Sequence, residues 1–304
     1  MDDQKEILKP QMNKMKNLVI AFLSILTLAS CNSNDEKTEK SAVDSAATVN
    51  TTFDHVLGMW VGDFIAEEYQ EGSYSENKLS LVIKSIDKDK VIGRSVVVGN
   101  DRPLQGTLTN SGNKITFVLD EPGDQKYDGR FEFELNNDTL VGTWKSYNQE
   151  INVTKRSFKL LKKVFAYNPN LMLDKNGDYT DRQSSKVKTV TDTIDGKAET
   201  FEDEYYRSAS KAVFTINSST QELKESDLKN LRKLDLQILR NTIFARHGYS
   251  FKKKTYRQFF DRADWYIPVS NDVNGTLTAL EKKNIKLLER FEKYAEDNYD
   301  SFGR

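Results

Sequence analysis

The spacing of apolar residues divides the chain into two parts. Over 57–161 apolar and polar residues alternate with period two, the spacing of a strand with one buried face. From Glu225 onward apolar residues recur at three- and four-residue intervals, the spacing of an amphipathic helix. Residues 164–222, between these two parts, are less regular. The pattern predicts an α+β chain in which a strand-rich part precedes a helical part.

The strand-rich part is broken into short runs by clusters of Asp, Asn, Gly and Pro that are typical of tight turns. The runs are 78–83, 90–98, 114–119, 130–135, 138–144 and 153–161, with a first strand opening near Gly58. About eight short strands joined by tight turns predict an antiparallel barrel or a sandwich, and the pattern leaves both open.

The helical part contains three predicted helices. One passes through Leu234, Ile238 and Ala245 and ends at Gly248, where a glycine can take the left-handed C′ conformation. A short helix is expected over 255–261. The last should run over about 278–297, because Thr278 and Glu281 have the spacing of a capping box. Asn241 has no propensity advantage inside a helix, so we expect its side chain to satisfy a backbone group.

The irregular part shows weaker alternation over 186–194 and 211–216. These runs predict two further strands on either side of an acidic stretch, 199–204. We expect that stretch to be a solvated loop.

Several residues of the helical part form a longer pattern. They are Leu239, Arg240, Asn241, Ala245, Arg246, His247, Gly248, Tyr249, Phe251, Trp265, Tyr266, Glu281, Asn284 and Ile285. This pattern resembles the signature of the YARHG domain, a module expected in extracytoplasmic proteins. The sequence departs from the signature at Phe244, where the name-giving tyrosine would stand, and at Thr242, where an acidic residue is usual.

The strand-rich part has a weaker resemblance. Gly58, Met59 and Trp60 open the first strand, and Gly142 and Trp144 lie in the next-to-last. A G-x-W start followed by up-and-down strands is similar to the lipocalin-like, or calycin, group. The resemblance implies that the tryptophan packs across the closed end of a barrel, and both Trp60 and Trp144 should be buried. A barrel of this size is packed solid or holds one small ligand.

A targeting segment precedes both parts. Met15 and Lys16 are followed by an apolar run over 18–28, which is shorter than the ~20 residues that span a bilayer. The run ends in Leu28, Ala29, Ser30 and Cys31, which resembles a lipobox. The resemblance implies cleavage before Cys31 and its acylation in a bacterial lipoprotein, with Met15 as the expected start of translation.

The predicted organisation has five parts. They are a signal peptide over 1–31, a disordered tether over 32–51, an antiparallel β domain over 52–163, an irregular connecting segment over 164–222 and a YARHG domain over 223–304. The expected location is the bacterial cell envelope, with a lipid anchor in the outer membrane and the protein on its periplasmic or outer face.

Composition limits the chemistry. Lys and Arg number 45 and Asp and Glu number 46, so no global field would attract nucleic acid. One cysteine and two histidines exclude internal disulfides and cysteine-based zinc sites. No nucleophile elbow, Walker loop or metalloprotease motif occurs. We therefore expect no metal, no cofactor and no enzymatic activity.

The candidate binding residues are Arg246, His247, Tyr249, Trp265 and Tyr266, which could hold a cell-wall glycan or peptide. A structural alternative is that cationic residues simply suit a helix C-terminus; Asn241, Gly248 and Glu281 would then support the fold, with Glu281 pairing with Arg246. The sequence favours a binding or scaffold lipoprotein. Two alternatives are an envelope hydrolase that uses His247 with nearby carboxylates, and a lipocalin-like carrier of a small lipophilic ligand.

Overall fold

The structure is a computed structural model that describes residues 53–71, 76–112 and 114–296. The predicted signal peptide, the lipidation site Cys31 and the tether over 32–51 lie outside the described residues. No helix in the described ranges is long and apolar enough to cross a membrane.

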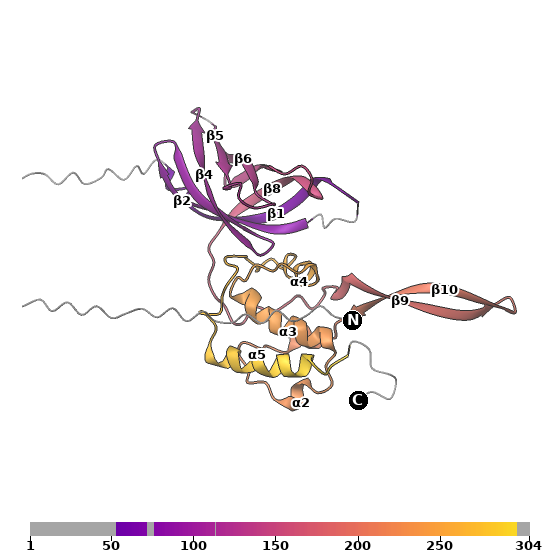
Figure 1. The fold of residues 1–304 in the computed structure, drawn as a ribbon. Coiled ribbons are helices and arrows are strands. Elements are labelled where there is room, and N and C mark those ends of the chain that lie inside the picture. Colours follow the sequence, from indigo (N-terminus) through magenta and orange to yellow (C-terminus); the bar gives the residue numbers. More distant parts are fainter. Residues whose placement is uncertain (1–52, 72–75, 113, 297–304) are drawn as a thin grey trace, which may run out of the picture. The chain divides into compact units, whose positions relative to one another are not determined.

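The strand-rich part is a closed antiparallel barrel (Figure 1). Each strand pairs with the next, and the first pairs with the last, so the open choice between barrel and sandwich resolves to a barrel. The strands are β1 (Gly58–Tyr69), β2 (Glu76–Asp87), β3 (Lys90–Val97), β4 (Asn100–Asn110), β5 (Ile115–Asp120), β6 (Gly129–Asn136), β7 (Thr139–Ser146) and β8 (Val153–Lys163). The predicted α+β class and the number of strands are confirmed.

One strand, β4, has no counterpart among the predicted runs. Pro103 lies near its middle, and a proline argues against a strand that is paired on both sides. In the barrel, β4 pairs with β3 from Asn100 to Thr107 but with β5 only from Gln105 onward. Pro103 therefore occupies a stretch with one neighbour, where its missing N–H is tolerated.

One end of the barrel core is built around Trp60. The Trp60 side chain is 2 % exposed, and its Nε1 donates a hydrogen bond to the Val56 carbonyl at 2.8 Å. Phe53 and Val56, in the segment that enters β1, pack on the same core. This arrangement is consistent with a lipocalin-like fold.

The connecting segment is a long two-stranded hairpin of β9 (Thr180–Ile194) and β10 (Lys197–Ser208) (Figure 1). The acidic stretch over 199–204 lies within β10, so the prediction of a loop there is wrong. The turn is Asp195 and Gly196, both with positive φ, which is the two-residue turn that suits the twist of a hairpin. The predicted strand over 211–216 is also wrong, because this stretch contains a short helix.

The helical part contains α1 (Ala212–Thr215), α2 (Glu225–Leu228), α3 (Lys233–Arg246), α4 (Lys254–Phe260) and α5 (Ala279–Glu292). Leu236, Leu239 and Ile243 of α3 share a core with Ile285 and Leu288 of α5. Hydrophobic burial between these two helices fixes the ends of both, and those ends carry the residues of the predicted site.

Candidate functional site

The residues predicted to bind a ligand are mostly buried. Arg246 is 1 % exposed, His247 5 % and Tyr266 2 %, while Tyr249 and Trp265 are half-buried. They surround the C-terminus of α3, where Gly248 has a φ of +75° and ends the helix. Three of the five side chains are therefore buried in the helical part, and the other two are only partly accessible.

His247 is held between two helix ends. Its Nε2 lies 2.8 Å from Glu281 Oε2, and its Nδ1 lies 3.0 Å from the hydroxyl of Thr276. The ring of Tyr167 stacks on the imidazole with centroids 4.3 Å apart, and its hydroxyl donates to Glu281 Oε1 at 3.0 Å. Tyr167 was not among the predicted residues, because it lies far from the signature in the sequence.

Glu281 is the acceptor at the centre of this network. Burial alone would raise the pKa of Glu281, but hydrogen bonds from His247 and from the Thr278 backbone lower it to about 2. The same carboxylate completes the capping box of α5, because it accepts the Thr278 N–H at 2.9 Å while its own N–H donates to the Thr278 hydroxyl. An ionised Glu281 therefore joins the end of α3 to the start of α5.

The predicted pair between Arg246 and Glu281 is wrong, since His247 takes that place. The Arg246 guanidinium donates to the Leu171 carbonyl at 2.7 Å and to the Ser219 hydroxyl at 2.9 Å. Burial lowers the pKa of Arg246 to about 10. A partner on a segment 75 residues away could not be recognised from helical spacing.

The other signature residues also satisfy backbone groups. Trp265 Nε1 donates to the Met172 carbonyl at 2.9 Å, and the Tyr266 hydroxyl donates to the Tyr249 carbonyl at 2.7 Å. Asn241 Nδ2 donates to the Gln237 carbonyl at 2.7 Å within α3. These contacts favour the structural reading of the signature, in which its polar groups pair buried backbone atoms.

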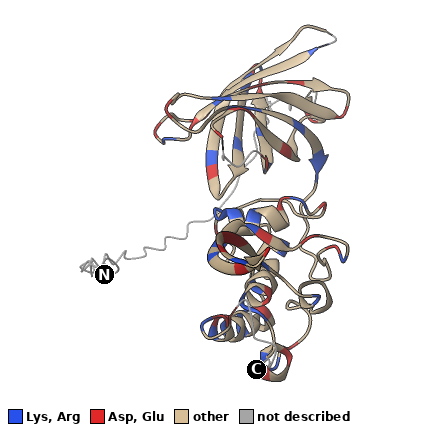
Figure 2. Ribbon diagram, turned by 90° about the vertical axis from the view of Figure 1, so that its right-hand side faces the viewer, with Lys and Arg blue, Asp and Glu red and all other residues tan. Residues whose placement is uncertain are grey.

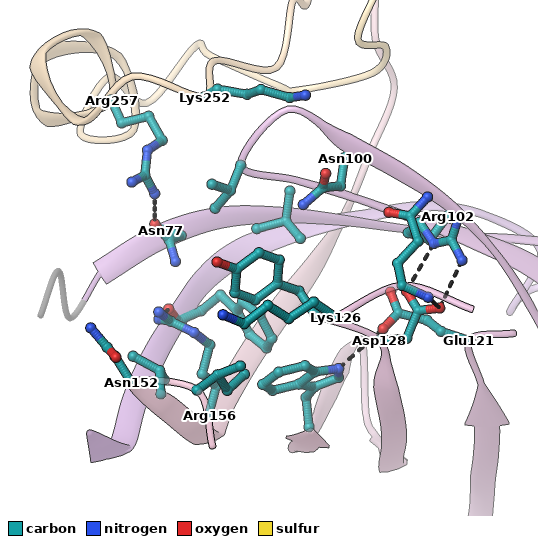
Figure 3. Close-up of a pocket in the computed structure, with 18 of the residues that line it drawn as sticks. Asn77, Asn100, Arg102, Glu121, Lys126, Asp128, Asn152, Arg156, Lys252 and Arg257 are labelled. Atoms are coloured by element: carbon teal, nitrogen blue, oxygen red, sulfur yellow. Dashed lines mark hydrogen bonds and ion pairs between the residues drawn. The ribbon is translucent and has the colours of Figure 1, made fainter. Parts of the chain in front are cut away.

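A second region of the chain offers an accessible cavity of about 750 Å³ at one end of the barrel (Figure 3). The inward positions of the strands are apolar over most of their length, then change to polar side chains at this end. The polar inward residues are Asn77 of β2, Ser95 of β3, Arg102 of β4, Glu121 after β5 and Arg156 of β8. The barrel is thus packed at the Trp60 end and open at the other.

The floor of this cavity is aromatic. Phe64, Phe131 and Trp144 all line it. The ring of Phe64 lies 6.1 Å from that of Phe131 and 5.8 Å from that of Trp144, in stacked and edge-on arrangements. Such a surface offers an apolar contact for a planar or aliphatic group.

Glu121 is a buried acid in the cavity wall. One carboxylate oxygen accepts from the Ser95 hydroxyl at 2.8 Å, and the other accepts from Gly129 N at 2.8 Å and from Trp144 Nε1 at 3.3 Å. Burial raises the pKa of Glu121 to about 7 in spite of these donors. The neutral form keeps all three contacts, because the Ser95 hydroxyl can accept as well as donate.

Asp128 is the second acid of the wall, and it is neutralised. Its carboxylate accepts from Arg102 Nε at 2.9 Å and Nη2 at 2.7 Å, and from Gly123 N at 2.9 Å. Figure 3 shows Arg102 beside Asp128 and Glu121 on one side of the cavity and Arg156 with Asn152 on the other.

Cations outnumber acids around the cavity. Its charged lining residues are Glu71, Arg102, Glu121, Lys126, Asp128, Arg156, Lys252, Lys254 and Arg257. Basic and acidic positions otherwise interleave along the strands and helices (Figure 2). The excess of positive charge is therefore local to the cavity.

The sequence contains a signal for this cavity that the period-two alternation alone does not reveal. A polar residue at an inward position interrupts the expected period, and Ser95, Glu121 and Arg156 each do so near a strand end. Closure of the barrel is needed to see that these ends lie at the same rim.

We expect Glu121 to make stability depend on pH. Because its pKa is raised from 4.5 to about 7 on folding, its contribution is fully present below pH 4.5 and is lost as pH rises through about 7. Glu121→Gln should remove this loss. Between pH 4 and pH 8 its free energy of unfolding, measured with urea, should therefore rise by about 3 kcal/mol relative to that of the wild type. The raised pKa of Asp261 acts equally in both proteins and cancels. If the free energies of unfolding of the two proteins changed in parallel with pH, the raised pKa of Glu121 would be contradicted.

Groups suited to metal binding are absent from the described ranges: no cluster of three or more His, Cys, Asp or Glu side chains occurs there.

Comparison with known proteins gives one finding. The model of the YARHG domain matches residues 211–293, a range that begins before the predicted boundary at Leu223 and includes α1. No curated protein and no solved structure matches the chain. The match covers the signature residues and the three longer helices around them. The C-terminal part of the chain is therefore a YARHG domain, a module typical of extracellular or periplasmic proteins.

Proposed function

We propose that the chain is an extracytoplasmic binding protein whose barrel cavity holds one small, partly apolar ligand. The observation that carries the proposal is the cavity of about 750 Å³ at the open end of a closed barrel. Its volume is within the range of about 300–1,000 Å³ that is usual for small-molecule sites. A concave site with an aromatic floor and polar walls favours binding over a purely structural role for the barrel.

The lining supports a ligand with an apolar face. Phe64, Phe131, Trp144 and Ile151 line the cavity and offer contact to an apolar part of a ligand. The amides of Asn100 and Asn152 lie around the same cavity and could orient polar atoms of the ligand.

We further propose that Cys31 anchors the protein to a membrane of the cell envelope. The support is the lipobox-like run from Leu28 to Cys31 after an apolar segment, together with the extracytoplasmic character of the YARHG domain. Multiple acyl chains, at ~0.8 kcal/mol per buried methylene, would hold the protein stably at the membrane. Incorporation of a labelled fatty acid into the wild type but not into Cys31→Ser tests this proposal.

A binding role is favoured over the hydrolase alternative. The side chains of His247 and Glu281 are 3 % and 0 % exposed, so a substrate could not reach that pair without an opening of the helical part. The structural contacts of the signature residues suggest that the YARHG domain of this chain acts as a scaffold.

The binding proposal is tested with a neutral fluorescent probe, N-phenyl-1-naphthylamine, titrated into the full chain. We expect saturable binding at one site per chain, with a rise in fluorescence as the probe leaves water. The matched variant is Asn152→Trp, which adds bulk at an exposed position of the cavity lining and should weaken binding at least tenfold.

Arg130→Met is the control, because Arg130 is an exposed residue outside the cavity and should not change the affinity. Probe binding that Asn152→Trp leaves unchanged would place the probe elsewhere and refute the cavity as the site.

A further inference from the structure

We propose that two copies of the chain associate through the β9–β10 hairpin, with their β9 edges paired antiparallel about a two-fold axis at Val190. The product is a continuous four-stranded sheet with the strand order β10, β9, β9 of the partner and β10 of the partner. The surface lies outside the barrel cavity, so the proposal goes beyond the binding function and does not depend on it.

The first argument is that the hairpin is an incomplete sheet. Within the described ranges this sheet has two strands, so the outer edge of β9 has no neighbouring strand over 185–194. The side chains of Val187, Ile194 and Phe201 are 59 %, 45 % and 44 % exposed. A two-stranded hairpin is marginally stable in water, and further strands stabilise it. A second copy of the hairpin would supply two such strands.

The second argument is the direction of the backbone groups along β9. Ile194 and Lys197 flank the two-residue turn, and a flanking pair of this kind exchanges both hydrogen bonds across the hairpin. Because hydrogen-bonded pairs alternate along an antiparallel ladder, the N–H and C=O groups of the odd-numbered residues over 185–193 point outward. The Thr193 N–H has this direction, since it donates to Asp192 Oδ1 at 2.8 Å.

A two-fold axis at Val190 suits both the backbone and the apolar side chains. It places Thr189 opposite the partner's Thr191, so outward backbone groups of one copy meet outward groups of the other. Val190 then lies opposite the partner's Val190. Because Val190 and Phe201 are directly opposite within the hairpin, the four side chains from the two copies form one apolar row across the sheet.

The third argument is charge complementarity. Within the hairpin Asp192 lies opposite Glu199, and like charges on opposite residues destabilise a sheet. The same axis places Asp192 opposite the partner's Lys188 and Lys188 opposite the partner's Asp192, which offsets this repulsion twice. Both pairs fall at positions without hydrogen bonds between the two β9 strands, where opposite side chains are closest.

The outer edge of β10 is unsuited to the same pairing. It carries an acidic run of Glu199, Glu202, Asp203 and Glu204. Charged side chains on an edge strand oppose pairing with another chain. Head-to-tail pairing of β9 with β10 of a further copy would leave an edge free at each end and would grow without limit. Two-fold pairing of β9 instead leaves only the acidic edges outside, so association ends at two copies.

The first experiment measures association of the full chain carrying Cys31→Ser, a change that removes the only cysteine of the sequence. We expect sedimentation velocity to show a reversible equilibrium between monomer and dimer at concentrations up to about 200 μM, without larger species. A chain that stays monomeric over this range, or that forms a series of larger assemblies, would overturn the proposal.

A change of charge separates pairing between copies from the stability of the hairpin. Asp192→Lys brings opposite charges together across the hairpin, at Glu199, but like charges together between the copies, at the partner's Lys188. We therefore expect this variant to weaken the dimer at least tenfold. Adding Lys188→Asp restores opposite charges between the copies and should return the dissociation constant to within about threefold of its starting value.

Asp138→Lys is the matched control, because it makes the same change of charge in an exposed turn between β6 and β7. It should leave the dissociation constant unchanged. If Asp192→Lys dimerised as tightly as this control, the proposed pairing would be wrong.

A cross-link tests the position of the axis. In the proposed register the two Val190 α-carbons lie about 4.5 Å apart, which is within the range of a disulfide. In the Cys31→Ser background, Val190→Cys should form a covalent dimer on mild oxidation, while Thr200→Cys on β10 should remain monomeric at the same concentration. Equal cross-linking of the two variants, or none in Val190→Cys, would refute pairing of the β9 edges at Val190.

Discussion

His247→Ala is expected to lower the free energy of unfolding by ~3–5 kcal/mol, because it leaves Glu281 ionised, buried and without its partner. The loss should be larger than that for a surface pair, since the two side chains are nearly inaccessible to water. Chemical unfolding followed by helical circular dichroism at pH 7 measures the change.

The same network predicts how stability responds to acid. The pKa of Glu281 is lowered from 4.5 to about 2 on folding, so its contribution is present above pH 4.5 and is lost as pH falls through about 2. The shift corresponds to about 3 kcal/mol, and Glu281→Gln should remove this part of the acid dependence.

Two further variants make the test specific. Lys283 lies on the same helix as Glu281 and makes an exposed pair with Glu222. Lys283→Ala removes this pair and should change stability by less than about 0.5 kcal/mol. The double variant of His247 and Glu281 should lose less than the sum of the single losses, because the pair acts as a unit. A fully stable His247→Ala variant would refute the structural reading and reopen a functional role for the imidazole.

Trp60→Ala should cost ~3–5 kcal/mol of barrel stability. The indole is buried at the packed end and bonded to the Val56 carbonyl, so its removal leaves a large cavity and an unpaired acceptor. Urea unfolding followed by far-ultraviolet circular dichroism at strand wavelengths measures the loss.

Val164→Ala is the matched control, because Val164 follows β8 and is 89 % exposed, so its loss should change stability little. A small effect of Trp60→Ala, similar to that of Val164→Ala, would mean that the packed end does not depend on the indole.

The sequence predicted those features that depend on local chemistry. Gly248 at the end of α3 and the capping box of Thr278 and Glu281 follow from backbone rules that act over a few residues. Strand alternation located seven of the barrel strands for the same reason, since each strand has one buried face.

Features that depend on distant segments were missed or mistaken. The partner of Arg246 is the Leu171 carbonyl, and a backbone acceptor leaves no mark in the sequence. The strand β4 was hidden by Pro103, whose tolerance depends on where β5 begins to pair. The cavity was missed because its lining comes from separate strands and from residues 252–257, which come together only in the folded chain.

The segment that precedes the hairpin has a consequence for where the C-terminal module begins. Its backbone carbonyls at Pro169, Leu171 and Met172 accept hydrogen bonds from Asn217, Arg246 and Trp265. Tyr167 adds the stacking ring over His247. The packed C-terminal module is therefore larger than the matched range of 211–293, and a fragment cut at those limits would lack the partners of its own signature residues.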